Sequence, residues 1–377
     1  MRQFSVKRLG EILVDDDSRK QFLAKVRLQC RRILIFLTLS YVISLLLCIV
    51  FFRYVGEKNL TFAFGLYVPR AVFLLPAIIL FPVLLLIHRR LFALLAVACA
   101  LFVWIGMGWE IRKTPTAVTS QAGKEITVLT YNRGQNANQS LQPFKNATTP
   151  DVVALQEASG RAGRYAEATG YEEFKFTKSE GEFTLLSRYP ISSSALVIVP
   201  QGNRGLATAA RFEIDFSGTP IAIYNVHVIS PRDTLKYYFR GSFLYGIIGI
   251  PGTSLGEKRK INQVFWDERV EQARELVQIM RDDPLPVLIV GDFNAPAGGY
   301  IHSLFQGVFS DAHAESGHGF GYSFPGVTRN PLSLGGPWMR IDYLYCNENW
   351  TPVWCITESD RPSQHRAVTA QFRIENE

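Results

Sequence analysis

The chain has 377 residues, of which 47% are hydrophobic, with a mean hydropathy of +0.07 and a formal net charge of +7 at pH 7. Residues 1–113 hold 16 Lys and Arg against 6 Asp and Glu, which leaves 24 against 27 for residues 114–377. The larger part of the chain therefore lacks the basic field of a protein that holds many phosphates of a polynucleotide, which weakens a nuclease interpretation without excluding it.

Three apolar segments occupy the first third of the chain. They are Ile33–Phe52, Ala71–Ile87 and Leu91–Trp109, and each is long enough to cross a bilayer. Three such runs in succession favour membrane helices over a buried soluble bundle. Only His88–Arg90 separates the second segment from the third, so these two are expected to form a tight helical hairpin.

Basic residues predict the orientation of these segments. Six Lys and Arg lie between residues 19 and 32, ahead of the first segment, and an Arg pair follows the second. The connection between the first and second segments carries fewer. The positive-inside rule then places the N-terminus in the cytoplasm, and three crossings place everything after Trp109 in an extracytoplasmic compartment. The predicted location is thus a multi-pass membrane protein with an external domain.

The predicted organisation has four parts. A basic cytoplasmic N-terminus covers residues 1–32, three transmembrane helices cover 33–112, a linker covers 113–125, and a globular domain covers 126–377. Cys346 and Cys355 lie in the globular domain, in a stretch that reads as a β-hairpin. A disulfide and two free thiols are both compatible with this placement.

The globular domain alternates strand-like runs with loops. The runs cover residues 126–132, 152–157, 183–191, 194–199, 205–214, 221–229, 286–294, 340–346 and 368–374. The clearest helix is Phe265–Asp283, whose apolar residues recur along one face. Many strands with few helices predict two packed sheets flanked by helices, an α/β sandwich.

Polar side chains stand at the ends of several strand-like runs. In α/β proteins this is where ligands bind. The alternative for Asp292 alone is a turn cap, and the alternative for His227 alone is a core histidine on a strand. Because so many runs share the feature, we expect one convergent site, formed by Asn132, Glu157, Asn225, His227, Asp292, Asn294, Asp342 and His365.

Three of these motifs, taken in order, carry a family resemblance. Leu155-Gln156-Glu157, Gly291-Asp292-Phe293-Asn294 and Ser363-Gln364-His365 resemble motifs of the endonuclease/exonuclease/phosphatase superfamily, which has the DNase I-like fold. The resemblance covers roughly residues 126–374, and the three apolar segments make the chain similar to a membrane-anchored bacterial type. It implies a four-layered α/β sandwich that hydrolyses phosphate esters with Mg²⁺ or Mn²⁺.

The resemblance also implies a role for each site residue. Glu157 is the expected main metal ligand, with Asn132 beside it, because hard oxygen donors suit Mg²⁺.

The expected catalytic group has five members. His365 contacts the scissile phosphate, and Asp342 orients its imidazole. Asp292 aligns or deprotonates the attacking water. Asn294 and His227 hold phosphate oxygens from either side.

One position departs from the family pattern. The family usually has Asp immediately before the last histidine, where this chain has Gln364. The neutral side chain removes one anionic ligand, which predicts weaker metal affinity or a single-metal mechanism. A catalytically decayed binding module therefore stays open as an alternative, beside an active enzyme.

The loop Ser230–Lys260 bears on the substrate. It mixes aromatic, apolar and basic residues, a composition suited to a lipid interface, and it follows His227. An insertion that covers the domain's own core is an equal alternative. The expected function is a membrane-anchored phosphoesterase acting on phosphate mono- or diesters. Its expected partners are the bilayer and a phosphate ester, with a lipid phosphate favoured and nucleic acid as the alternative; no protein partner is inferable.

Other residues receive weaker interpretations. Arg204 either faces phosphate or lies in an exposed loop, and Glu182 is a candidate support for His227. His302, His313 and His318 have no ligand spacing and are expected to be surface or loop residues.

Overall fold

The computed structural model describes residues 16–111, 123–134, 140–199, 207–237, 255–326, 335–361 and 363–374. The described residues group into two compact units. One contains the ranges up to Cys48 and Phe73–Phe102, and the other contains Ile49–Val72 and the ranges from Val103 onward. The first unit is mostly apolar helix, and the second contains every strand of the described chain.

The first helix is longer than the apolar segment within it. Helix α2 (Asp16–Tyr54) has 39 residues, with Asp16 and Asp17 in its first turn, where acidic side chains favour a helix start. At about 1.5 Å per residue it measures about 58 Å, roughly twice the thickness of a bilayer's hydrocarbon core. Residues Asp16–Arg32, which lie in the predicted basic N-terminus, form one continuous helix with the apolar segment. They contain no glycine or proline that would end the helix.

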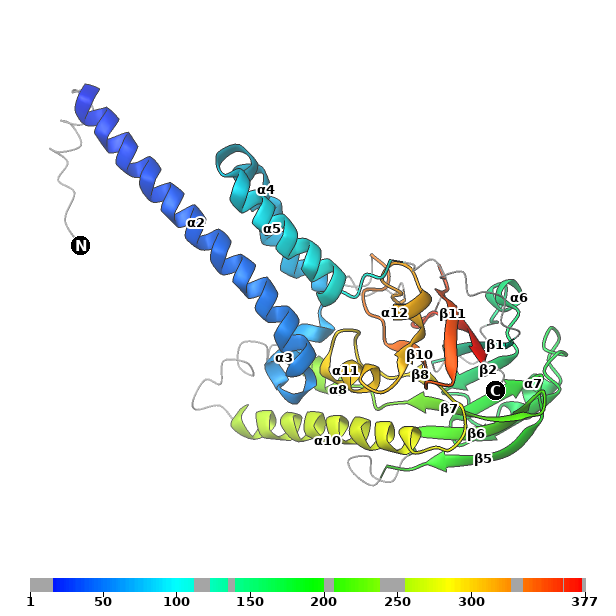
Figure 1. Ribbon diagram of the computed structural model, residues 1–377. Helices are drawn as coiled ribbons and strands as arrows, with labels where there is room; N and C mark the ends of the chain where they lie inside the picture. Colours follow the sequence, from blue (N-terminus) through cyan, green and yellow to red (C-terminus); the bar gives the residue numbers. More distant parts are fainter. Residues whose placement is uncertain are drawn as a thin grey trace. The chain divides into compact units, whose positions relative to one another are not determined.

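The predicted helical hairpin is confirmed. Helix α4 (Leu75–Ile87) runs into α5 (Arg89–Leu101) with only His88 between them, and the two lie antiparallel (Figure 1). The His88 Nδ1 accepts a hydrogen bond from the Leu91 N–H at 3.4 Å and caps α5. A π-helical turn, η3 (Phe102–Gly106), continues α5. Three helical stretches in the described chain, Asp16–Tyr54, Arg70–Ile87 and Arg89–Gly106, are long and apolar enough to cross a membrane.

The second unit contains two six-stranded sheets (Figure 1). The order in the first sheet is β11 (Trp350–Thr357), β12 (Val368–Ile374), β1 (Lys124–Asn132), β2 (Val152–Gln156), β4 (Phe183–Ser187) and β3 (Phe176–Glu180). In the second it is β5 (Ile191–Val197), β6 (Ala209–Phe216), β7 (Thr219–His227), β8 (Val287–Asp292), β10 (Asp342–Cys346) and β9 (Ser310–Asp311). Among these pairs, β1–β2 and β7–β8 are parallel and the others antiparallel.

The sheets pack face to face, and helices cover their outer faces. Helices α10 (Leu255–Arg281) and α11 (Tyr300–Gln306) share a core with the second sheet, and α6 (Phe144–Thr148) and α7 (Ala162–Ala166) share one with the first. The remaining helical elements are η1 (Gly56–Lys58), α3 (Leu60–Tyr67), η2 (Arg70–Leu74), α8 (Arg232–Tyr237) and α12 (Ala312–Ser316). The predicted α/β sandwich is confirmed; its long helix starts ten residues before the predicted Phe265.

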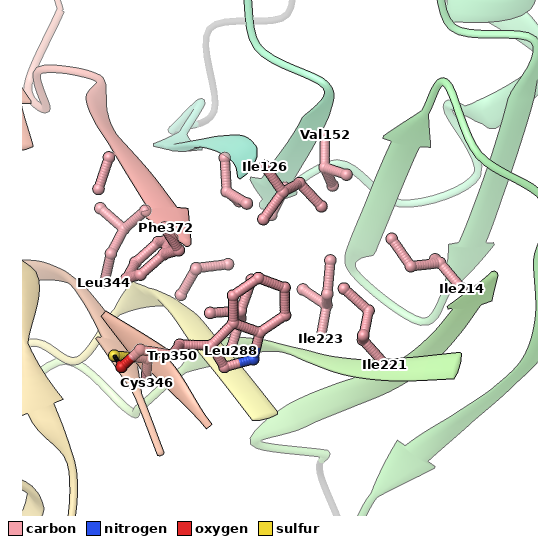
Figure 2. Close-up of a cluster of buried hydrophobic side chains, with 14 of the residues drawn as sticks. Ile126, Val152, Ile214, Ile221, Ile223, Leu288, Leu344, Cys346, Trp350 and Phe372 are labelled. Atoms are coloured by element: carbon pink, nitrogen blue, oxygen red, sulfur yellow. Dashed lines mark hydrogen bonds between the residues drawn. The ribbon is translucent and has the colours of Figure 1, made fainter. Parts of the chain in front are cut away.

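The core between the sheets follows the two-residue period of a strand. Ile126 and Val152 come from the first sheet, and Ile223, Leu288 and Leu344 from the second (Figure 2). All are buried, and neighbouring residues on the same strands face the helices instead. This alternation fixes which strand-end residues point into the space between the sheets.

The predicted hairpin around Cys346 and Cys355 is wrong. Strand β10 pairs with β8 and β9 in the second sheet, whereas β11 pairs with β12 in the first. Both edges of β10 are therefore already occupied, and the chain crosses to the other sheet after Cys346. The two cysteines are buried and free. The predicted run 183–191 likewise divides, with β4 in one sheet and the start of β5 in the other.

Gly291, on β8, is expected to tolerate no side chain. Its φ is +143°, and a Cβ there would meet the Val226 carbonyl oxygen on β7 at 2.0 Å. Gly291→Ala should lower the free energy of unfolding by about 3 kcal/mol or more, since β8 must separate from β7. Thermal unfolding of the purified full chain measures this.

Gly218→Ala is the matched control for Gly291→Ala. Gly218 also has a positive φ, +86°, but a Cβ added there would have no other atom within 4 Å. Its substitution should cost only about 1 kcal/mol. Equal losses for the two variants would show that the close approach of β7 and β8 is not what requires glycine.

Candidate active site

Three neighbouring strands of the second sheet place polar side chains in one row. His227 is opposite Asp292 in the β7–β8 pair, and Asp342 is opposite Asp292 in the β8–β10 pair. Each lies on the inward-facing side of its strand: His227 comes four residues after Ile223, Asp292 two after Val290, and Asp342 two before Leu344. The row is therefore the polar end of the same face that builds the core between the sheets.

The first sheet contributes Asn132 and Glu157 at the ends of its parallel strands. Asn132 is 1% exposed, and its Nδ2 donates to the Asp292 Oδ2 at 2.9 Å and to the Glu157 Oε1 at 3.3 Å. Glu157 follows β2 with a φ of +50°, a left-handed conformation that is uncommon outside glycine. Asn132 thus joins carboxylates from both sheets.

Asn294 has a left-handed backbone as well, with a φ of +49°. Its N–H donates to the Asp292 Oδ1 at 2.8 Å, and its Nδ2 donates to the Val228 carbonyl at 2.9 Å and to the Asp292 Oδ2 at 3.1 Å. The Gly-Asp-Phe-Asn stretch therefore folds back on itself, with the Asn294 amide held against the Asp292 carboxylate.

His365 and Asp342 form a buried pair. The His365 Nδ1 lies 3.1 Å from the Asp342 Oδ2, and the His365 ring also packs on Phe324 with centroids 4.8 Å apart. Burial lowers the pKa of His365, but the negative charges of Asp342 and Asp292 outweigh it and leave the pKa raised. The imidazole is thus held in one orientation and favours its protonated form.

His227 has a carboxylate partner of its own. Its Nδ1 lies 3.0 Å from the Glu182 Oε1, in the turn between β3 and β4. Burial lowers the pKa of His227, while the hydrogen bond to Glu182 and the charges of Asp292, Glu182 and Glu157 raise it to about 9. The expected supporting contact from Glu182 is present in the structure, and the raised pKa favours the protonated form of His227 at neutral pH.

The side chains of His365 and His227 both face the Asp292 carboxylate. The Nε2 atoms of His365 and His227 lie 3.7 Å and 3.8 Å from the Asp292 Oδ2. These distances are longer than a hydrogen bond, so both N–H groups stay available to a further acceptor beside the carboxylate. A phosphate ester, with its anionic oxygens, is an acceptor of this kind.

The donor set fits a hard divalent cation. Glu157 and Asn132 supply carboxylate and amide oxygens, and within the described ranges no Lys or Arg forms an ion pair with Glu157 or Asp292. The Asn132 Nδ2 faces Glu157 and Asp292, while its Oδ1 accepts from the Gly134 N–H at 2.8 Å, so a metal contact through Oδ1 beside Glu157 requires the amide to turn over. A second set of possible metal ligands lies close by: Asp292, Asp342 and His365 have ligand atoms within 4.8 Å of one another.

The structure adds a buried network that the sequence did not identify as such. The Gln156 Nε2 donates to the Asn225 Oδ1 at 2.6 Å and to the Thr130 Oγ1 at 3.0 Å, and the Asn225 Nδ2 donates to the Leu155 carbonyl at 3.1 Å. All three side chains are buried. Asn225, expected among the site residues, therefore ties the two sheets together beneath the site.

Several weaker expectations are also resolved. The Gln364 Oε1 accepts a hydrogen bond from the Arg232 Nη2 at 3.1 Å at the exposed rim. His302 and His313 are buried, not surface residues; His302 pairs with Asp311 at 3.1 Å, and the His313 Nε2 lies 3.1 Å from the Gly319 carbonyl oxygen. Arg204 and residues 238–254 of the loop Ser230–Lys260 lie outside the described residues.

The fold and the site together define a DNase I-like α/β sandwich with a polar site at one end of both sheets. The model of the endonuclease/exonuclease/phosphatase family matches residues 131–365, and the chain belongs to this family. Members of the family are usually phosphoester hydrolases and generally depend on a divalent metal. No curated protein matched the chain.

Several solved structures resemble the chain at low identity. A humanized TDP2 of D. rerio is 15% identical, covers 66% of this chain and 98% of its own, and has a TM-score of 0.45. Sphingomyelinase C from Streptomyces griseocarneus is 18% identical, with coverages of 66% and 99% and a TM-score of 0.42. An endonuclease/exonuclease/phosphatase from Beutenbergia cavernae is 17% identical, with coverages of 67% and 72% and a TM-score of 0.44.

Proposed function

We propose that this protein is a membrane-anchored phosphoesterase that hydrolyses phosphate mono- or diesters with Mg²⁺ or Mn²⁺ outside the cytoplasm. The observation that carries the proposal is the convergence of carboxylate, amide and charged imidazole groups from both sheets around Asp292. Such a site provides hydrogen-bond donors for an anion on one side and oxygen ligands for a metal ion on the other.

In this proposal each residue acts through the contacts described above. Glu157 and Asn132 would hold the cation, which when bound neutralises charge on phosphate oxygens. His365, oriented by Asp342, donates a hydrogen bond or a proton to the phosphoryl group. Asp292 accepts the hydrogen bond of the attacking water and orients it. Because these groups are fixed by buried partners, most of the catalysis is positioning and charge stabilisation.

Asn294 and His227 complete the anion contacts. His227 faces Asp292 with its Nε2 and is held by Glu182 on the other ring nitrogen, so it is suited to donate to a phosphate oxygen. The Asn294 amide lies against the same carboxylate, with its Nδ2 3.1 Å from the Asp292 Oδ2. Gln364, engaged with Arg232 at the rim, leaves one carboxylate fewer than the family pattern, in keeping with a single-cation mechanism.

The proposed membrane topology has three crossings with the catalytic domain outside. Its support is the three long apolar helices and the basic residues before the first of them. The segment Ile49–Val72, between the first and second helices, belongs to the same compact unit as the catalytic domain. Three crossings put both on the same side of a membrane. A lipid-borne phosphate is the favoured substrate because the domain is anchored and lacks a net basic charge.

A substrate panel tests this function. The full chain in detergent or lipid nanodiscs is given polyprenyl phosphates, phospholipids, sphingomyelin, plasmid DNA and a chromogenic phosphodiester, each with Mg²⁺ or Mn²⁺. Turnover of lipid phosphates in preference to DNA is the expected result. DNA cleavage that steepens at low salt would favour a nuclease instead. Equal inertness of wild type and Glu157→Gln on every ester would leave the decayed binding module.

A further inference from the structure

The connection between the first two apolar helices is built into the catalytic domain. We call Ile49–Val72 the interspan segment; it includes the end of α2, η1, α3 and the start of η2. Three of its polar side chains, Glu57, Tyr67 and Arg70, are 8% exposed or less. A short loop between membrane spans is normally solvated, so burial of three polar groups requires partners within the domain.

Those partners lie in the loop that follows β8 and at the start of α11. The Glu57 Oε2 accepts hydrogen bonds from the backbone N–H groups of Tyr300 at 2.7 Å and Ile301 at 3.2 Å. The Arg70 Nη1 donates to the Ala297 carbonyl at 2.7 Å. Both contacts are more than 220 residues apart in sequence, and together they fix the end of the loop that begins at Asp292.

Tyr67 reaches the site residue itself. Its hydroxyl donates to the Asn294 carbonyl at 2.6 Å, and Arg269 on α10 donates to the same carbonyl at 2.9 Å. The Arg269 Nη1 also donates to the Tyr67 oxygen at 2.9 Å, which closes a three-membered network. Trp266, fully buried, packs against the Tyr67 ring with centroids 5.6 Å apart. The network is therefore buried, where its hydrogen bonds are stronger than in water.

This network bears on a strained backbone. Asn294 has a left-handed φ of +49°, a conformation that costs a non-glycine residue free energy and persists only where its surroundings hold it. Its carbonyl is held by Tyr67 and Arg269, and its side chain is then directed at the Asp292 Oδ2 at 3.1 Å. The position of the Asn294 side chain therefore depends on how its backbone carbonyl is held.

We propose that the interspan segment is a positioning element of the active site, in which Tyr67, with Arg269, fixes the turn that aims Asn294 at Asp292. The inference rests on the proposed function and deepens it, since a segment far from the catalytic residues in sequence then completes the site. Tyr67 is a positioning residue, because it touches the backbone of Asn294 and not the reacting groups. A chain that starts after the third apolar helix would lack it, so the full chain is the proper object of the test.

The test is a double-mutant cycle with a structural readout. Tyr67→Phe, Asn294→Ala and the double variant are made in the full chain in detergent, and kcat and KM are measured on bis(4-nitrophenyl) phosphate with Mn²⁺. Tyr67→Phe should lower kcat by between about 10- and 100-fold with a smaller change in KM. On the Asn294→Ala background it should add no more than about twofold, because it acts through Asn294. Additive losses would overturn the proposal.

Hydrogen–deuterium exchange tests the same contact without activity. Peptides covering residues 292–301 should exchange faster in Tyr67→Phe than in wild type. Tyr41→Phe is the matched control, since the Tyr41 hydroxyl also donates to a backbone carbonyl, that of Phe73 at 2.7 Å, within the other unit. It should leave exchange at 292–301 unchanged. Unchanged exchange in Tyr67→Phe would overturn the inference.

The two proposals fail in different ways. A wild type that is inert on the dye and on the substrate panel, with faster exchange in Tyr67→Phe, counts against the phosphoesterase and supports the positioning contact. An active wild type with an equally active Tyr67→Phe counts against the positioning element alone. If Tyr67→Phe fails to fold, Glu57→Gln is a second variant, at the other end of the loop. It should raise hydrogen–deuterium exchange at Tyr300 and Ile301.

Discussion

Glu157→Gln should lower kcat/KM for phosphate-ester hydrolysis by about 10³-fold or more, equivalent to about 4 kcal/mol of transition-state stabilisation. The substitution keeps the size of the side chain and the Asn132 contact but removes the negative charge that a divalent cation requires. The stabilisation of the full chain by Mn²⁺ in a thermal-unfolding experiment should disappear with it. Steady-state kinetics and a Mn²⁺ titration of thermal unfolding measure both effects.

Glu180→Gln is a matched control for this prediction. Glu180 ends β3, is half-buried as Glu157 is, and accepts a hydrogen bond from the Ser194 hydroxyl at 2.6 Å. Its substitution should leave kcat/KM within about twofold and the Mn²⁺ response intact. A Glu157→Gln variant that retained wild-type Mn²⁺ stabilisation would mean that the cation binds elsewhere.

His365→Asn is expected to lower kcat by about 10³-fold, since it removes the group that donates to the phosphoryl oxygen. Asp342→Asn should cost about 10- to 100-fold, because the imidazole stays but loses the partner that orients it. His313→Asn removes a second buried imidazole, whose Nε2 lies beside the Gly319 carbonyl. It should lower the thermal stability and leave kcat near that of wild type.

Asp342→Asn also makes a prediction for pH. Burial lowers the pKa of His365, and the charge of Asp342 is the largest of the contributions that raise it. Without that charge the pKa falls, so the protonated imidazole is lost at a lower pH. If His365 acts as the acid, the alkaline limb of the kcat/KM profile should move to lower pH in Asp342→Asn. An unmoved limb would assign the acid role to another group.

The polar row of the site was predictable from the sequence for a simple physical reason. Strand side chains alternate between two faces, so a polar residue two positions after a buried one continues on the same face. His227 and Asp292 obey this rule relative to Asn225 and Val290, and Asp342, two residues before Leu344, obeys it in the opposite direction along its strand. Glu157 and Asn294 escape it, because their left-handed backbones redirect them; their places at strand ends and the family motifs identified them instead.

The predicted β10–β11 hairpin failed because strand pairing is decided by partners far away in sequence. The residues between Cys346 and Trp350 are a normal hairpin turn by composition, but β10 already has two neighbours. Similarly, nothing local in the interspan segment distinguishes Tyr67 from an interfacial tyrosine of a membrane protein. Its partner carbonyl at Asn294 is 227 residues away. An acidic residue, Glu57, between two apolar segments is a local feature that hints at such packing.

The central claim is a divalent cation held at Glu157 across from His365, and anomalous diffraction from crystals of the full chain soaked in Mn²⁺ tests it most directly. The account predicts an anomalous peak about 2.2 Å from a Glu157 carboxylate oxygen, with the His365 imidazole facing the same space. A peak confined to Asp292, Asp342 and His365, with Glu157 turned away from it, would contradict the account.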